Sequence, residues 1–213
     1  MGVLNSKLNQ CDWLKDQYKM NLSAELERIE NQLKGTEFYP SLGNVFDAFL
    51  ELREFPKIVI VGTDPYPDGR ATGIPFSVSD DYTGQCPNSL KTLNRVFGLE
   101  RGTRSEWVKW MNENRVLLLN KSLTKIPGHS TFRVWQKFIM AILKTIAENG
   151  GSVAFWLMGH EAKMLKRFLE KYNCQVICTC HPSVAYCKSV TQNDCFKLIW
   201  ERIGFGLLKG SRE

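Results

Sequence analysis

Four short apolar runs constrain the fold of this chain more than any other feature. They lie at residues 58–61, 116–120, 153–157 and 175–179. The first shows no alternation of apolar and polar residues, which is typical of a strand buried on both faces. Stretches of helical periodicity lie between and after the runs, at 89–97, 105–114, 135–148, 161–171 and 193–202. The alternation predicts an α/β fold with a central four-stranded parallel sheet flanked by helices on both faces.

The first 55 residues carry helical spacing and no strand-like run. Leucine and isoleucine recur at helical intervals from residue 22 to residue 33, and Gly35 is expected to end that helix. The chain contains no internal repeat, low-complexity tract or Ser/Gly-rich linker. We therefore expect a single domain over residues 1–213, with a helical N-terminal portion at 1–55 and an α/β core at 56–205.

Composition narrows the class of protein. A hydrophobic content of 43% and a net charge of +6 are ordinary for a globular chain and permit a polyanionic partner. No apolar run reaches membrane-spanning length and the N-terminus lacks a signal-peptide core, so we expect no membrane association and an intracellular setting. That setting is the cytoplasm of a bacterium or of a virus-infected cell, or a nucleus. The seven cysteines include no Cys-x-x-Cys pair, which favours structural thiols over a metal or iron–sulfur site.

Polar side chains follow the apolar runs. Asp64 comes after the first run on a rigid Pro65-Tyr66-Pro67 turn, Asn120 ends the second, and His181 follows the fourth. Because the carboxyl ends of parallel strands share one edge of a sheet, we expect these three side chains to converge there. Each also has a structural alternative. Asp64 can cap a turn, Asn120 can bond local backbone and His181 can be a packing residue.

The three groups suit chemistry on a flat polar ring. Asp64 can serve as a general base, a nucleophile or a stabiliser of positive charge, and His181 as an acid, a base or a donor to a leaving group. The carboxamide of Asn120 matches an amide-like edge such as that of a nucleobase. Phe76 is either a stacking platform or part of the core. The chain has no phosphate-binding loop, nucleophile elbow or dinucleotide-binding glycine pattern, which excludes the usual nucleotide triphosphatases and dehydrogenases.

From residue 38 to residue 203 the sequence resembles the Ung-type family of uracil-DNA glycosylases, with the motifs in the family's order. The similar motifs are Gly62-Thr-Asp-Pro-Tyr66 (water-activating loop), Gly73-Ile-Pro-Phe-Ser-Val78 (uracil-stacking segment), Pro87-Asn-Ser-Leu90 (proline-rich loop), Leu117-Leu-Leu-Asn120 with Leu123-Thr124 (base-recognition strand), Phe155-Trp-Leu-Met-Gly159 and His181-Pro-Ser183 (intercalation loop). The resemblance implies that the protein flips uracil out of DNA and hydrolyses its glycosidic bond, leaving an abasic site in DNA repair.

The resemblance also implies roles for individual residues. Asp64 would stabilise the sugar cation and orient water, and a neutral His181 would donate a hydrogen bond to the departing base. Phe76 would stack on uracil, Asn120 would bind its Watson–Crick edge and Tyr66 would exclude thymine. Thr63 would complete the substrate-binding set, and the implied DNA contacts are Ser89, Gly159, His160, Ser183, Ala185 and Tyr186. The family's chemistry implies no metal and no cofactor.

The sequence departs from the family pattern at several positions. Thr63 replaces a glutamine and Pro67 a histidine, as in the poxvirus members, and His160 replaces a serine. The residue expected to fill the space of the flipped base is Ala185, which is too small for that task, with Tyr186 as a possible substitute. We therefore expect better activity on single-stranded or weakly paired DNA, where unstacking costs less.

Two alternatives to uracil excision remain open. One is a glycosylase for a different modified pyrimidine, and the other is a non-catalytic DNA-binding or replication-accessory protein on the same fold. The expected partners are single- or double-stranded DNA and a proteinaceous glycosylase inhibitor, for a protein expected to be monomeric. Cations near the sheet edge are predicted to contact phosphate, with a solvated surface as their alternative role: Arg70, Lys121, Lys125 and Lys188.

Overall fold

Four parallel strands form the centre of the molecule. The computed structural model describes residues 2–149, 151–187 and 195–203, with the backbone alone for 185–187. The strands pair in the order β2-β1-β3-β4. Their bounds are β1 Ile58–Gly62, β2 Val116–Asn120, β3 Ala154–Met158 and β4 Gln175–Thr179. The predicted four-stranded parallel sheet is therefore confirmed, with the third strand displaced by one residue from its predicted position.

The order of the strands indicates at which edge of the sheet a ligand is expected to bind. Every residue of β1, β2 and β3 is buried, whereas β4 lies at the edge of the sheet and begins with an exposed Gln175. The chain moves from β1 to β2 on one side and then to β3 on the other. In open parallel sheets, ligands bind outside the carboxyl ends of the strands near such a reversal. At that edge Gly62 of β1 lies opposite Asn120 of β2.

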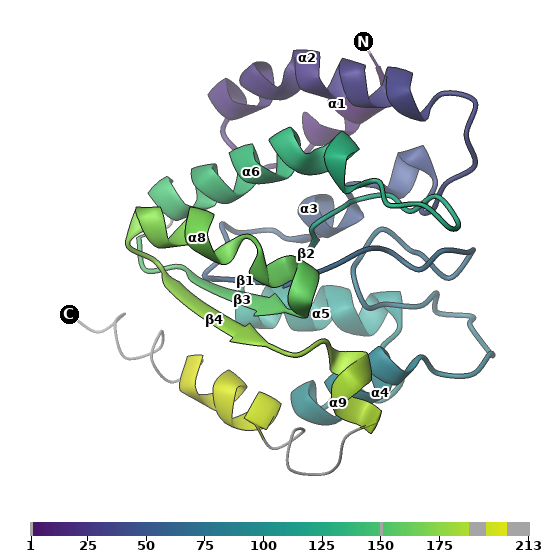
Figure 1. Ribbon diagram of the computed structural model, residues 1–213, viewed down its shortest axis with the longest axis vertical. Coiled ribbons are helices and arrows are strands. Elements are labelled where there is room, and N and C mark those ends of the chain that lie inside the picture. Colours follow the sequence, from purple (N-terminus) through teal and green to yellow (C-terminus); the bar gives the residue numbers. More distant parts are fainter. Residues whose placement is uncertain (1, 150, 188–194, 204–213) are drawn as a thin grey trace.

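Helices cover both faces of the sheet, as predicted (Figure 1). One face carries α6 with α8, and the N-terminal α1 and α2 form a further layer outside α6; the other face carries α5, α4 and α9. The helical bounds are α1 Val3–Leu8, α2 Asp16–Leu33, α3 Asp47–Glu51, α4 Asn88–Phe97, α5 Arg104–Asn114, α6 Phe132–Asn149, α7 His160–Lys163, α8 Lys166–Leu169 and α9 Pro182–Cys187, with 3-10 turns η1 Leu42–Asn44 and η2 Glu170–Tyr172.

Local sequence signals explain the helix ends near the site. The Thr103 hydroxyl accepts from the backbone N–H of Glu106, whose carboxylate accepts from the N–H of Thr103; this capping box begins α5. Gly98 ends α4 in a left-handed conformation with φ 70°. Between these two ends the chain turns from α4 into α5, which then leads directly into β2.

Two predicted helices differ from the structure. The segment 161–171 is divided into α7, α8 and η2, because α7 packs against β3, whereas α8 packs against β4 and α6 and η2 packs against α6. The last predicted helix, 193–202, is helical over 195–203, and its first two residues lie outside the described part. Among the described residues, no helix combines the length and the apolar character needed to cross a membrane.

Candidate active site

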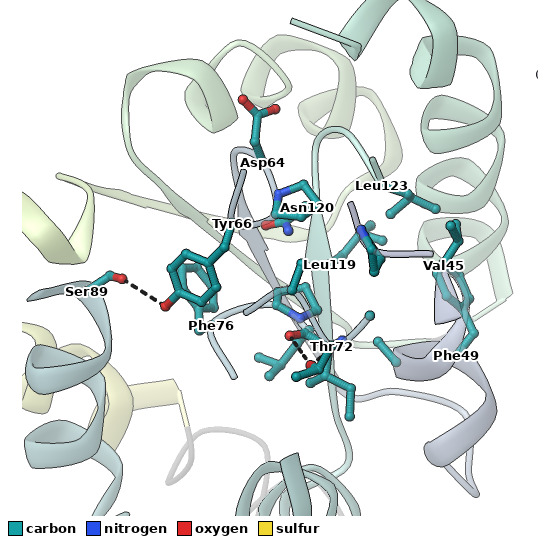
Figure 2. Close-up of a pocket in the computed structure, with 18 of the residues that line it drawn as sticks. Val45, Phe49, Asp64, Tyr66, Thr72, Phe76, Ser89, Leu119, Asn120 and Leu123 are labelled. Carbon is teal, nitrogen blue, oxygen red and sulfur yellow. Dashed lines mark hydrogen bonds between the residues drawn. The ribbon is translucent and has the colours of Figure 1, made fainter. Parts of the chain in front are cut away.

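A cavity of about 580 Å³, counting its open mouth, lies at the carboxyl edge of the sheet. Segments that are far apart in the sequence form its wall, from Pro40 to His181. Six of the residues singled out in the sequence line it: Asp64, Tyr66, Phe76, Ser89, Asn120 and His181. Figure 2 shows five of these residues labelled around the cavity. Asp64, Asn120 and His181 therefore line one cavity at this edge, as predicted, although the Asp64 carboxylate points toward its rim (Figure 2).

Asn120 occupies the floor of this cavity. It is the last residue of β2 and is only 5% exposed. Its carboxamide has no hydrogen-bond partner among the described residues and borders the cavity, so both its donor and its acceptor remain for a ligand. Gly62 lies beside it, and a Cβ on Gly62 would approach the Asn120 Oδ1 atom to 2.6 Å and the Phe76 Cζ atom to 2.7 Å. Only glycine at position 62 leaves room for both side chains.

The loop 72–78 presents Phe76 to the cavity in an unusual backbone conformation. Phe76 has φ 65°, in the left-handed region that non-glycine residues rarely adopt and that costs about 1 kcal/mol or more. Hydrogen bonds within the loop hold it there: the hydroxyls of Thr72 and Ser77 bind each other, and Ser77 Oγ donates to the Ile74 carbonyl at 2.9 Å. Gly73, with φ 91°, lies so close to the Asn44 carbonyl that no side chain would fit.

His181 also lines the cavity, beside Phe76 of this loop. Its ring and the Phe76 ring are 6.3 Å apart at 46°. The Ser183 backbone N–H donates to His181 Nδ1 at 3.3 Å, and the Ser183 hydroxyl lies 2.8 Å from the same atom. Nδ1 is therefore an acceptor, which leaves the proton of a neutral imidazole on Nε2. Burial lowers the pKa of His181 from its ordinary value, because the charged form loses its hydration. The arrangement favours a neutral imidazole with one N–H free to donate.

Tyr66 forms another side of the cavity. Its hydroxyl lies 3.5 Å from the Ser89 hydroxyl, as Figure 2 shows, and the Arg70 guanidinium lies over its ring at 5.1 Å from the centroid. Burial raises the pKa of Tyr66, so the phenol stays protonated. Ser89 itself is buried in the first turn of α4 and faces the cavity. Its hydroxyl therefore binds Tyr66 rather than lying on an exposed face, and its predicted DNA contact remains a prediction.

Asp64 stands at the rim with its carboxylate in an ion pair. The Asp64 Oδ2 atom accepts from Lys125 Nζ at 2.9 Å, and each side chain is about a fifth exposed. In Figure 2 the carboxylate points away from Asn120 and Phe76, toward the outside of the cavity. The sequence had suggested a phosphate contact for Lys125, and its spacing gave no sign of a partner 61 residues away.

Other predicted positions lie around the cavity rather than in it. Thr63 is half-buried and is not among the lining residues; its carbonyl accepts from the Ser122 N–H at 3.1 Å. Gly159, with φ 97°, packs closely on His181, where a Cβ would lie 3.1 Å from the histidine Cβ. His160 is exposed at the start of α7. The side chains of Ala185 and Tyr186 lie outside the described part.

Two expectations about the surroundings of the site are wrong. The segment beginning His181-Pro182-Ser183 was expected to form a loop, but Pro182–Cys187 is helix α9 because Pro182 suits the first turn of a helix and α9 packs on α4. Lys121 was expected to contact phosphate, but it is 3% exposed. Its ammonium pairs with Glu161 at 2.5 Å and lies over the Phe132 ring. Arg70 pairs with Asp68 at 2.6 Å, and Lys188 lies outside the described residues.

Sequence patterns did not reveal two features of the site, the close approach of side chains at Gly62 and the pairing of Lys125 with Asp64. Gly62 was named as the end of a strand and the first residue of the motif Gly62–Tyr66, but its steric role was not recognised, although a glycine in a buried strand often marks close approach by another group. For Lys125 no such signal exists, because an ion pair across 61 residues depends on the tertiary fold. Among the described residues, no group of three or more His, Cys, Asp or Glu side chains is placed to hold a metal ion.

Comparison with known proteins assigns the family. The model of the uracil DNA glycosylase superfamily matches residues 50–204. The chain belongs to the uracil-DNA glycosylase superfamily. It is 34% identical to the uracil-DNA glycosylase of Campylobacter concisus over 80% of this chain and 77% of that protein. It is 32% identical to the uracil-DNA glycosylase of Fusobacterium nucleatum over 84% and 83% of the two chains.

Solved structures support the fold of a uracil-DNA glycosylase. The wild-type enzyme of Nitratifractor salsuginis superposes with a TM-score of 0.61 at 18% identity, over 90% of this chain and 94% of that one. Mimivirus uracil-DNA glycosylase superposes with a TM-score of 0.60 at 21% identity over 84% of this chain, which spans 66% of the mimivirus chain, less than two thirds. The predicted family resemblance and the predicted fold are both confirmed.

Proposed function

We propose that this protein excises uracil from DNA by hydrolysis of the N-glycosidic bond, using the cavity at the carboxyl edge of the sheet. The observation that carries the proposal is the unpartnered carboxamide of Asn120 in a cavity that Phe76 and His181 also line. A planar base with an amide-like edge satisfies that carboxamide, and Phe76 offers its ring for stacking. The enzyme is a DNA repair hydrolase of its family, and the following roles are proposed for this chain's own residues.

The uracil ring enters the cavity after the nucleotide rotates out of the stack. Asn120 donates to and accepts from its Watson–Crick edge, and Tyr66 occupies the space that a 5-methyl group would need. Thymine is excluded because its methyl group would meet the Tyr66 ring. The partly buried ring of Tyr66, with its hydroxyl 3.5 Å from the Ser89 hydroxyl and its place in the cavity wall, supports this role.

Hydrolysis separates charge along the glycosidic bond. As the bond between C1′ and the base nitrogen breaks, its electron pair leaves with the base and the sugar becomes cationic. The Nε2–H of neutral His181 donates to the carbonyl oxygen on which the base carries its negative charge. Asp64 stabilises the cation from the rim and orients the water whose oxygen bonds to C1′. This water loses one proton to Asp64, and the uracil anion takes up one proton from solvent, giving free uracil and an abasic site. The hydrogen bonds at His181 Nδ1 support this assignment of the proton.

An abasic-site assay with matched variants tests the proposal. A single-stranded oligonucleotide with one uracil is incubated with the protein, and strand cleavage by alkali is read on a gel. Asp64→Asn is expected to lower kcat by about 10²- to 10⁴-fold, because an amide cannot stabilise the sugar cation as a carboxylate does. Asp81→Asn, at an exposed carboxylate outside the cavity, is the control and should retain full activity.

The outcomes separate the alternatives. Product from uracil but not from thymine or cytosine, lost in Asp64→Asn, supports uracil excision. Product only from a 5-substituted pyrimidine would assign a different base to the same cavity. DNA binding without product from any base would contradict catalysis altogether.

We also propose that the enzyme prefers single-stranded or weakly paired DNA. The side chain of Ala185 is too small to fill the space that a flipped base leaves in the duplex. Its contacts with the neighbouring bases therefore do not offset the free energy needed to unpair a stable duplex. The ratio of kcat/KM on single-stranded to perfectly paired substrate should exceed one, and Ala185→Leu should lower this ratio by raising duplex activity. Equal rates on both substrates, unchanged in Ala185→Leu and Tyr186→Ala, would contradict the preference.

Partners follow from the same surface. DNA is the substrate. A relative from mimivirus has been solved in complex with UGI, at a TM-score of 0.59 and 22% identity. We propose that a proteinaceous inhibitor of that kind binds this enzyme over the same rim, which competition with a single-stranded oligonucleotide would test.

A further inference from the structure

The ion pair between Lys125 and Asp64 is a feature that the proposed reaction does not use. It joins the carboxylate at the cavity rim to an ammonium at 2.9 Å, and the side chains are 22% and 21% exposed. Both groups thus remain in contact with solvent, and neither is sealed in the core. An ion pair of this kind exchanges partners readily, because water solvates both charges when they separate.

The backbone of Lys125 is fixed at the rim. Its N–H donates to the Tyr39 carbonyl at 2.7 Å, and its carbonyl accepts from the Tyr39 N–H at 2.9 Å. Pro40, next to Tyr39, lines the cavity. The base of the lysine is therefore held beside the cavity mouth, while its flexible four-carbon stem lets the ammonium move.

Two nearby cations have partners that leave Asp64 untouched. The Lys121 ammonium is buried against Glu161 and the Phe132 ring, and Arg70 is bound by Asp68. Lys125 differs because its partner is the proposed catalytic carboxylate. A positive charge 2.9 Å from that carboxylate opposes the role assigned to it, since the ammonium competes with the developing sugar cation for the same negative charge.

We propose that Lys125 is a positioning residue that exchanges Asp64 for a phosphate of the bound DNA. In the free protein its ammonium pairs with Asp64, and in the complex it pairs with a phosphate next to the flipped nucleotide. This transfer leaves the charge of Asp64 to the sugar cation only when DNA is in place. The inference rests on the proposed function, because it assigns a step in the use of the same carboxylate.

The chemistry of the substrate supplies the second partner. Each nucleotide in a DNA strand is flanked by two phosphates, so a flipped nucleotide whose sugar lies at the cavity mouth brings both anions to the rim. A phosphate offers several charged oxygens to an ammonium that is already partly exposed. Release of counterions from the DNA favours the exchange as well.

A cycle that combines a variant with a modified substrate tests the exchange. The substrates are single-stranded oligonucleotides with one uracil, in which the 5′ or the 3′ flanking phosphate is either normal or a neutral methylphosphonate. In the wild-type protein, one of the two neutral linkages should lower kcat about tenfold, because Lys125 then stays on Asp64. In Lys125→Met, the same linkage should change kcat by less than twofold, because no ammonium remains to occupy Asp64.

The salt dependence provides a second readout. For Lys125→Met, the slope of log KM against log salt on the normal oligonucleotide should fall by about 0.7, the value for one phosphate contact on a single strand. Lys125→Arg should keep both the slope and the sensitivity to methylphosphonate. Lys144→Met removes a lysine paired with Glu148 on α6 and is the matched control, expected to behave as wild type in both measurements.

Several results would overturn the exchange. Equal loss in wild type and Lys125→Met, or no loss in wild type at either linkage, would show that Lys125 does not move to a flanking phosphate. A lower kcat in Lys125→Met with an unchanged salt slope would instead assign Lys125 a fixed role in orienting Asp64. Failure of the proposed function is distinct, because the wild-type protein would then release no uracil from the unmodified oligonucleotide.

Discussion

The side chains at the cavity floor are closely packed around Gly62. A methyl group there would lie 2.6 Å from Asn120 Oδ1 and 2.7 Å from a Phe76 ring atom. The backbones of both neighbours are held, one by strand β2 and the other by the hydrogen-bonded loop 72–78. Gly62→Ala therefore displaces the two groups proposed to hold the base, at a cost of about 1–3 kcal/mol.

We expect Gly62→Ala to lower kcat/KM by about 10- to 100-fold, since about 1.4 kcal/mol corresponds to a factor of ten. The assay is uracil release from a single-stranded oligonucleotide. Gly43→Ala is the control, because a Cβ at that position meets nothing within 4 Å. Activity within twofold of wild type in both variants would contradict the proposed fit.

The histidine of the site should make stability depend on pH. Burial lowers the pKa of His181 in the folded protein below its ordinary value of 6.5, and unfolding restores that value. Just below pH 6.5 the unfolded chain then binds more protons than the folded chain, so the free energy of unfolding decreases as the pH falls through this window. Above the window both states are neutral at this residue, and its full contribution is present.

Denaturant unfolding at pH 7.5 and at pH 5.5 measures this effect. The loss of stability between the two values should be smaller in His181→Gln than in wild type, because glutamine does not titrate. An identical loss in the two proteins would show that His181 is not held in its neutral form by the fold.

At the scale of elements, helix α9 links the imidazole to α4, which lies on the same face of the sheet (Figure 1). His181 directly precedes α9, and α9 packs on α4. The Thr92 hydroxyl of α4 donates to the Pro182 carbonyl at 2.9 Å and is almost fully buried. This bond fixes the start of α9, and with it the backbone from which His181 projects.

Thr92→Val removes the hydrogen bond from the Thr92 hydroxyl to the Pro182 carbonyl and should lower stability by about 1 kcal/mol. We expect kcat to fall severalfold with little change in KM, because the base still binds while its hydrogen-bond donor is less well placed. Thr145→Val on α6, another buried helical threonine, is the control and should leave kcat unchanged. A change in KM with kcat unchanged would argue against a link through α9.

The elements also show which features of the fold and the site can be predicted from the sequence. Buried strands and the polar residues that end them followed from apolar runs, so Asp64, Asn120 and His181 were placed on one edge in advance. The division of residues 161–171 did not follow, because no glycine or proline marks its breaks and packing against separate neighbours sets them. The same holds for Lys125, since charge patterns along a chain do not reveal which acid a lysine meets in space.

On the scale of the whole molecule, we propose that the N-terminal portion and the α/β core form one domain. One continuous apolar core includes Leu4 near the start of the chain and Ile203 near its end, and α2 packs on α6. A shared core favours a single cooperative unfolding transition, in which tryptophan fluorescence and far-ultraviolet circular dichroism report the same midpoint.

Leu26→Ala on α2 tests this organisation. Leu26 is fully buried, so its truncation should cost about 2–5 kcal/mol and shift both probes together. Met20→Ala on the same helix removes a side chain that is 77% exposed and should shift neither. Two separate transitions, with only the first moved by Leu26→Ala, would indicate that residues 1–55 form an independent unit.

The residues that line the cavity are spread along the chain from Pro40 to His181, and His181 is the last of them. During synthesis on the ribosome, the carboxylate, the aromatic ring and the carboxamide therefore emerge long before the imidazole. A partial chain that ends before residue 181 lacks the imidazole proposed to donate to the departing base, and without β3 the strand β1 has only one neighbour. The enzyme thus gains its capacity to damage a genome only when most of its polypeptide has been made.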